Sequence, residues 1–154
     1  MIKNISNLGD AAIYCDFGTE VNETVNSYVI SYFNYISDLV KKDKIQGISN
    51  LTPSYNKLII SFDLSTTNFS KLKKIIEKLD FKKDLETNNK KIKIPVCCND
   101  EYGLDFDRLS KKLNLNKEEI LKFYFDKEYF CYMTGFIAGM PFLGDLDKKI
   151  RCDR

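Results

Sequence analysis

The sequence predicts an α+β protein in which helices cover one face of an antiparallel sheet. Short apolar runs bounded by glycine or proline are typical of strands, and two longer segments place apolar residues at helical spacing. Up to about Cys97 these segments follow the order strand–helix–strand–strand–helix–strand. That order is typical of a ferredoxin-like sandwich, which we expect for residues 1–97.

The first strand and the first helix carry the clearest patterns. Residues 11–17 form an apolar run between two glycines, as expected of a buried strand. Thr19 is the expected N-cap of the helix that follows, and lysines near residue 42 suit the negative end of its dipole. The apolar face of this helix comprises Val21, Val25, Tyr28, Val29, Tyr32, Phe33, Ile36, Leu39 and Val40.

The next elements of the first domain are shorter. We expect strands at residues 44–50 and 57–62, with a turn at residues 52–55 between them. Asn68 is positioned to cap a second helix. The apolar face of that helix comprises Leu72, Ile75, Ile76 and Leu79.

The remaining predicted elements lie between residues 84 and 133. Residues 84–91 are polar and are expected to be exposed, and residues 92–96 are expected to form the fourth strand. Asn116 and Glu119 have the spacing of a capping box for a short helix. Residues 129–133 alternate as in a strand.

Composition places the chain among soluble globular proteins. Its 154 residues are 44% hydrophobic and 30% charged, with a formal net charge of +2. This near balance argues against a dedicated surface for nucleic acid or anionic membranes. No apolar run approaches the ~20 residues of a membrane span, and the N-terminus lacks the apolar core of a signal peptide, so we expect a cytoplasmic protein.

The absence of histidine limits the chemistry of the chain. No Ser-His or Cys-His pair can form, and imidazole is not available for proton transfer near neutral pH. The five cysteines include no Cys-x-x-Cys pattern, so we predict no metal site and expect reduced, structural thiols.

Residues 132–146 form the most unusual segment. Glycine and proline alternate with large apolar side chains, a composition that fits neither a helix nor a regular strand. We expect a loop pressed against other residues, in which Gly135, Gly139 and Gly144 supply backbone angles or close approaches. The segment is either a buried structural crossover or a binding loop.

This segment resembles a known family. Together with Gly9-Asp10, Pro53-Ser54-Tyr55 and Ile94-Pro95-Val96-Cys97, it resembles the B subunit of bacterial ATP-dependent 5-oxoprolinase. The family is also described as allophanate hydrolase subunit 1 or as the KipI kinase inhibitor. The resemblance covers residues 8–154 and is most specific at Tyr132-Met133, Gly135-Phe136, Gly139, Pro141 and Leu143-Gly144.

The resemblance implies a function and partners. It implies hydrolysis of 5-oxoproline to glutamate in a complex with the A and C subunits of 5-oxoprolinase, with ATP bound by the complex rather than assigned to this chain. The alternatives are a KipI-like inhibitor of a sensor histidine kinase and an inactive truncated remnant. We do not expect activity from the chain alone, and 5-oxoproline and allophanate remain open as substrates.

The resemblance also implies a second domain, a cyclophilin-like β-barrel, of which residues 98–154 are the first part. Because the family's chain continues past Arg154, we expect a truncated barrel. Its uncovered apolar side chains should lead the chain to bind a partner, to self-associate, or to keep a flexible tail after about Phe125.

The candidate site residues fall into two groups. The catalytic candidates are Glu101 and Tyr124, the latter standing where the family usually carries histidine. Tyr124 is otherwise a core tyrosine, and the acidic cluster around Glu101 (Asp100, Asp105 and Asp107) either serves acid–base or metal chemistry or, as we favour, helix capping. The predicted partner or substrate loop comprises Gly135, Phe136, Gly139, Pro141, Phe142 and Gly144.

Overall fold

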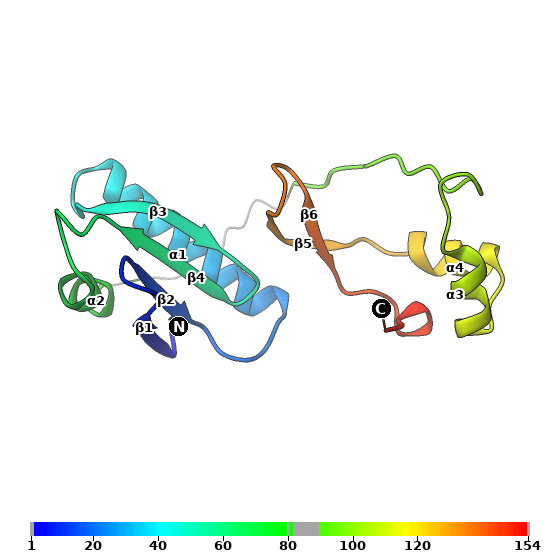
Figure 1. Cartoon of the computed structure of the whole chain (residues 1–154), viewed down its shortest axis with the longest axis horizontal. Coiled ribbons are helices and arrows are strands. Elements are labelled where there is room, and N and C mark those ends of the chain that lie inside the picture. The colour runs from blue at the N-terminus through cyan, green and yellow to red at the C-terminus, as the bar shows by residue number, and fades with distance from the viewer. Residues whose placement is uncertain (1, 80, 82–89, 154) are drawn as a thin grey trace. The chain divides into compact units, whose positions relative to one another are not determined.

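The chain divides into two compact units in the computed structural model, which describes residues 2–79, 81 and 90–153 (Figure 1). The first unit combines residues up to 88 with Tyr132–Met140, and the second combines Asn89–Cys131 with Pro141–Arg154. These units are defined by packing within this chain. The domain expected at residues 1–97 from the order of its elements, and the domain expected at residues 98–154 from the family resemblance, stay predictions.

A four-stranded antiparallel sheet forms the centre of the first unit. Its strands are β1 (Asn4–Asn7), β2 (Ala12–Asp16), β3 (Ile48–Pro53) and β4 (Lys57–Phe62), in the spatial order β1-β2-β4-β3. In the register of β2 and β4, Ile13 lies opposite Ile60 and Cys15 lies opposite Leu58. Because side chains alternate along a strand, these four apolar residues share one face of the sheet.

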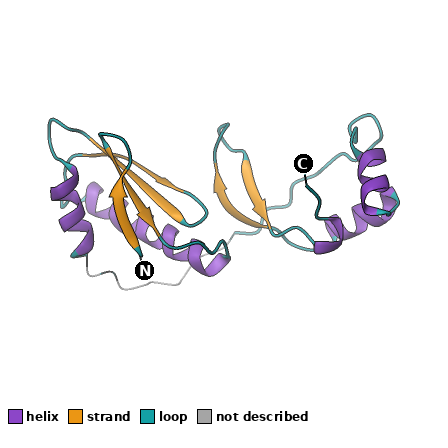
Figure 2. Cartoon of the chain, turned by 60° about the horizontal axis from the view of Figure 1, so that its bottom comes forward, coloured by secondary structure: helices purple, strands orange, loops and turns teal. Residues whose placement is uncertain are grey.

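Two helices cover that face (Figure 2). They are α1 (Glu23–Lys41) and α2 (Phe69–Glu77). Residues from the predicted apolar faces of both helices belong to one core with the sheet. The core residues are Ile13, Cys15, Phe17, Val29, Tyr32, Ile36, Ile45, Leu58, Ile60, Phe62, Leu72 and Ile76. The predicted α+β class, with helices on an antiparallel sheet, is confirmed.

The fourth strand comes from a different segment than the sequence predicts. Residues 92–96 are irregular and exposed, and β1 instead pairs with the edge of β2. Pro95 has no N–H to donate to a ladder, which disfavours regular pairing of its segment. β1 itself was missed because three of its four residues are asparagine or serine, which are not typical of strands.

The structure also bears on the strand expected at residues 44–50 and on the polar connection expected at residues 84–91. The strand expected at residues 44–50 is instead β3, which begins at Ile48 and extends to Pro53, inside the predicted turn. Its pairing with β4 has an irregularity between Ile48 and Asn50. Of the polar connection expected at residues 84–91, only residues 90 and 91 are described, and the rest lies outside the described residues.

The second unit contains two short helices, α3 (Phe106–Leu113) and α4 (Lys117–Phe125), and a 3-10 helix at Lys148–Ile150. Farther along the chain, β5 (Phe130–Thr134) and β6 (Pro141–Gly144) pair in a two-stranded sheet. The strand predicted at residues 129–133 is confirmed as β5. The prediction of a loop is wrong for β6, whose Pro141 is tolerated as the first residue of the strand. No described helix is long and apolar enough to cross a bilayer.

Candidate functional site

The turn between β5 and β6 is tightly closed by its own backbone. We call residues 135–140 the hairpin tip. Gly135 N–H donates to the Met140 carbonyl at 3.1 Å, and Met140 N–H donates to the Ile137 carbonyl at 3.0 Å. Gly139 has φ of +82°, so the predicted need for glycine holds at this position. Phe136 also has a positive φ, of +65°, which is uncommon for a residue with a β-carbon.

The hairpin tip presents apolar side chains to solvent. Phe136 is 90% exposed and Ile137 is 62% exposed, and Met140 is also exposed. Among the described residues, nothing covers the tip as a loop pressed against other residues would require, and the expectation of uncovered apolar side chains is confirmed at Phe136, Ile137 and Met140. Phe142, by contrast, is half-buried. Exposed apolar groups gathered on one turn are typical of an interaction surface.

The base of the hairpin is held by the turn between β3 and β4. The ring of Tyr132, which is almost fully buried, lies 5.5 Å from the ring of Tyr55. Ser54 Oγ donates to Met133 Sδ at 3.3 Å. A firmly packed base therefore carries an exposed tip.

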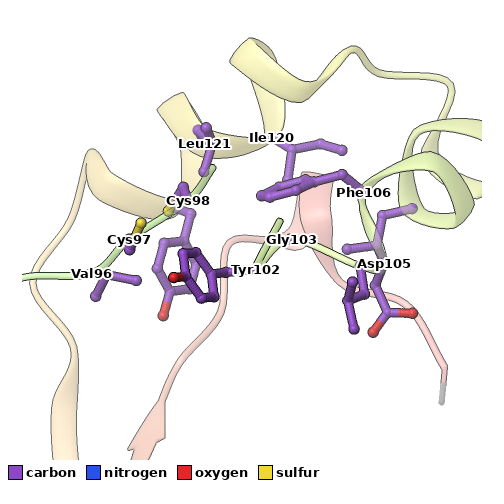
Figure 3. Close-up of a pocket in the computed structure, with 12 residues that line it drawn as sticks. Val96, Cys97, Cys98, Tyr102, Gly103, Asp105, Phe106, Ile120 and Leu121 are labelled. Atoms are coloured by element: carbon purple, nitrogen blue, oxygen red, sulfur yellow. The ribbon is translucent and has the colours of Figure 1, made fainter. Parts of the chain in front are cut away.

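A shallow cavity of about 440 Å³ lies within the second unit (Figure 3). Figure 3 shows Ile120 and Leu121 of α4 on one side and Phe106, at the start of α3, on another. Most of the residues that line the cavity are apolar or aromatic. The full lining comprises Val96, Cys97, Cys98, Tyr102, Gly103, Leu104, Asp105, Phe106, Leu109, Ile120, Leu121 and Tyr124. Its volume is in the range of small-molecule pockets.

The two catalytic candidates are placed differently with respect to this cavity. Tyr124 lines it, whereas Glu101 is exposed and does not belong to its lining. The Tyr124 ring lies 5.4 Å from the ring of Tyr129, and the Tyr129 hydroxyl donates to the Tyr124 carbonyl at 2.7 Å. Burial raises the pKa of Tyr129 above its usual value. The catalytic assignment of Glu101 and Tyr124 stays a prediction.

The acidic cluster is engaged by cations. Lys117 Nζ pairs with the Asp100 carboxylate, and this hydrogen bond holds the pKa of Asp100 below its usual value. Asp105 directly precedes α3, but its carboxylate accepts from Arg108 Nε at 3.1 Å and makes no side-chain cap. In the described part of the chain, no three side chains of cysteine, aspartate or glutamate are arranged to hold a metal ion.

Sequence reasoning missed one residue near the hairpin, Asn26 of α1. It is buried, and its amide reaches the backbone of Tyr132. A signal was available, because Asn26 lies three residues before Val29 and so falls on the buried stripe of an amphipathic helix.

Together, these features define a class of protein: a two-unit α+β chain with an antiparallel sheet and an exposed apolar hairpin. The family described as "Carboxyltransferase domain, subdomain C and D" matches residues 3–154, and the chain belongs to this family.

Two curated relatives have the same name. The chain is 31% identical to the 5-oxoprolinase B subunit of Bacillus subtilis (strain 168), in a match that covers 97% of this chain and 66% of the relative. It is 27% identical to the 5-oxoprolinase B subunit of Haemophilus influenzae (strain ATCC 51907 / DSM 11121 / KW20 / Rd), covering 71% of this chain and 48% of the relative. The chain thus spans less than two thirds of the length of either relative. The predicted resemblance to this family is confirmed.

A solved structure shares the fold. The crystal structure of TTHA0988 superposes with a TM-score of 0.75 at 21% sequence identity, covering 94% of this chain and 28% of the other. At this identity, the likeness concerns the fold alone.

Proposed function

We propose that this chain serves as the B subunit of an ATP-dependent 5-oxoprolinase, which hydrolyses 5-oxoproline to glutamate together with the A and C subunits. The observation that carries the proposal is the 31% identity to the 5-oxoprolinase B subunit over 97% of this chain. ATP is bound elsewhere in the complex, because the sequence has no glycine-rich loop followed by lysine that could cradle its phosphates.

The same proposal includes the finer fold assignment. The elements β2-α1-β3-β4-α2 follow the ferredoxin-like order, with β1 supplying the fourth strand at the edge beside β2. We assign residues 98–154 to a cyclophilin-like domain, on the family resemblance alone.

The hairpin tip is the surface that we assign to the contact with the C subunit. Large aromatic and aliphatic side chains dominate the centres of protein interfaces, and Phe136 and Ile137 are such side chains left in water. Phe136 is held in an uncommon backbone conformation, which is often found where local strain serves a binding role.

The cavity of the second unit is not sufficient to bind the substrate. 5-Oxoproline carries a carboxylate, and a carboxylate removed from water needs a cation or several hydrogen-bond donors. The described lining contains no lysine or arginine, and its one carboxylate, Asp105, is already paired with Arg108. We therefore propose that the other subunits complete the substrate site, and that Tyr102 and Tyr124 contribute at most hydroxyl groups.

Co-expression with the A and C subunits tests this function. We expect the chain to co-purify with the C subunit, and the assembled complex to convert 5-oxoproline to glutamate only when ATP is present. Substitution Phe136→Ser should weaken the retention of the C subunit by about tenfold or more, because an interface anchor is lost.

A matched control is available in the first unit. Leu64 lies in the loop between β4 and α2 and is 60% exposed, so Leu64→Ser removes a similar exposed side chain outside the hairpin. This variant should retain the C subunit. If the wild-type chain neither co-purifies with the C subunit nor changes the turnover of 5-oxoproline, the proposal is wrong.

A further inference from the structure

Asn26 is a polar residue in an apolar core. Its side chain is 1% exposed, on the face of α1 that packs against the sheet. Among the residues that the structure describes, Asn56 is the other buried polar residue, at 9% exposed. A buried amide is costly unless its hydrogen bonds are made, so the partners of Asn26 decide its role.

Three backbone carbonyls surround the Asn26 side chain. Its Nδ2 lies 3.1 Å from the carbonyl oxygen of Ser54, 2.9 Å from that of Tyr55 and 3.1 Å from that of Tyr132. Because all three are acceptors, the group that faces them is the donating NH₂. Two N–H groups serve three acceptors, so at least one of these hydrogen bonds is shared.

These carbonyls belong to segments that are far apart in the sequence. Ser54 and Tyr55 form the turn between β3 and β4, whereas Tyr132 lies 106 positions after Asn26. One side chain therefore joins α1, the β3–β4 turn and the start of the hairpin segment in a single buried contact. The ring contact of Tyr55 with Tyr132 and the hydrogen bond from Ser54 to Met133 lie beside it.

We propose that Asn26 is a positioning residue that fixes the segment Tyr132–Met140 within the first unit and thereby limits the directions in which the hairpin tip is presented. The tip begins three residues after Tyr132, so an anchor at the Tyr132 carbonyl limits the freedom of Phe136 and Ile137. The anchoring stands independently of the proposed function, and only its effect on binding of the C subunit rests on that function.

Hydrogen exchange of the wild-type chain and of Asn26→Asp tests the anchor. The substitution keeps the size of the side chain but replaces the donating NH₂ with a carboxylate oxygen, which is repelled by the three carbonyls. We expect amide exchange in residues 132–140 to become at least tenfold faster, while exchange in β2 and β4 stays close to wild type. Asn26→Ala, which removes the donor without adding charge, should act in the same direction and serves if Asn26→Asp does not fold.

Asn56 provides the matched control. Its Nδ2 donates to the carbonyls of Gly18 and Glu20, at 2.9 and 3.1 Å, in the segment that leads into α1. Asn56→Asp makes the same chemical change at the other buried asparagine, so it should lower overall stability without a selective rise in hairpin exchange. The proposal is overturned if hairpin exchange is unchanged in both Asn26 variants, or if Asn56→Asp accelerates it equally.

Measuring binding of the C subunit together with hydrogen exchange distinguishes a failure of the proposed anchor from a failure of the proposed function. Faster hairpin exchange in Asn26→Asp supports the anchor whether or not the C subunit binds, and unchanged exchange overturns it even where binding is retained. Phe136→Ser should lower binding while leaving hairpin exchange as in wild type, because that side chain takes no part in the Asn26 contact.

Discussion

The N-caps of α2 and α4 could be predicted from single residues, whereas that of α1 could not. The predicted caps Asn68 and Asn116 are confirmed, and Asn116 forms the full capping box with Glu119. Thr19 is wrong as the cap of α1, since the side chain of Asn22 accepts from Val25 N–H instead. Both residue types cap helices, so local preference did not decide between them.

A tertiary contact holds the residues just before the observed cap. Asn56 donates to the carbonyls of Gly18 and Glu20 and so holds these residues outside the helix. Asn56 is more than thirty positions away, and no pattern within the segment itself could have revealed it. The same reason explains why Asn26 was missed, because all its partners lie outside its own helix.

Because the thiol of Cys15 is buried, we expect the free energy of unfolding to fall at alkaline pH. The residue is fully buried, and burial raises the pKa of its thiol from the ordinary value of 9.0 to about 12. Between these values the unfolded state has released a proton that the folded state still binds, so the free energy of unfolding falls as pH rises. The expected slope from this group is at most about 1.4 kcal/mol per pH unit.

Urea unfolding of wild type and Cys15→Ala between pH 8 and pH 11 measures this effect. The free energy of unfolding of Cys15→Ala should fall less over this pH range than that of wild type. At pH 8 the variant should be the less stable protein, because alanine fills less of the core than cysteine does. Native-state alkylation is the control, since the exposed Cys97 and Cys131 should react and Cys15 should not. Parallel pH curves for the two proteins would contradict the prediction.

At the scale of elements, the helices were more predictable than the strands. An amphipathic helix carries its own pattern, and the core residues of α1 and α2 fall on the predicted faces. A strand is stable only when it finds a partner, and that partner can lie far away in the sequence. Thus β1 and β6 were missed, and the alternating segment at residues 92–96 did not pair within the described chain.

The capping box of α4 makes a prediction for one element. Asn116→Ala should destabilise the helix by about 1 kcal/mol, because the Glu119 N–H loses its acceptor. Hydrogen exchange in the first turn of α4 measures this loss. Glu119→Gln is the control, since glutamine also satisfies a capping box, and this variant should stay within a few tenths of a kcal/mol of wild type. Equal losses in the two variants would rule out the capping explanation.

The candidate site was predicted only in part. The cavity contains Tyr124 but not Glu101, and the need for glycine at position 139 was foreseen, whereas the positive φ of Phe136 was not. Side-chain chemistry can be listed from a sequence. Which side chains share a cavity depends on contacts between segments such as α3, α4 and the residues around Tyr102.

At the scale of the whole molecule, each unit exposes large apolar side chains. In the first unit these include Phe136, and in the second they include Leu104, at 85% exposed, with Ile92, Ile94, Val96 and Tyr102. Exposed apolar groups of this kind promote association. We expect the purified chain to form larger species as its concentration rises.

Analytical ultracentrifugation over a range of concentrations measures this association. The double variant Phe136→Asp and Leu104→Asp should stay monomeric, since it adds charge to both apolar surfaces. Val21→Asp together with Leu64→Asp adds the same charge at exposed apolar residues outside them and should associate like wild type. A wild-type chain that is monomeric at every concentration would count against the prediction.

The first unit is discontinuous in sequence, because Tyr132–Met140 joins it after the intervening residues of the second unit. During translation, the strands and helices of the sheet emerge from the ribosome well before this returning segment does. Until Tyr132 is synthesised, the two N–H groups of Asn26 have only the carbonyls of Ser54 and Tyr55 as acceptors, and the contact that joins α1 to the later segment does not yet exist. The first unit therefore gains its last segment only after a residue 106 positions beyond Asn26 has been translated.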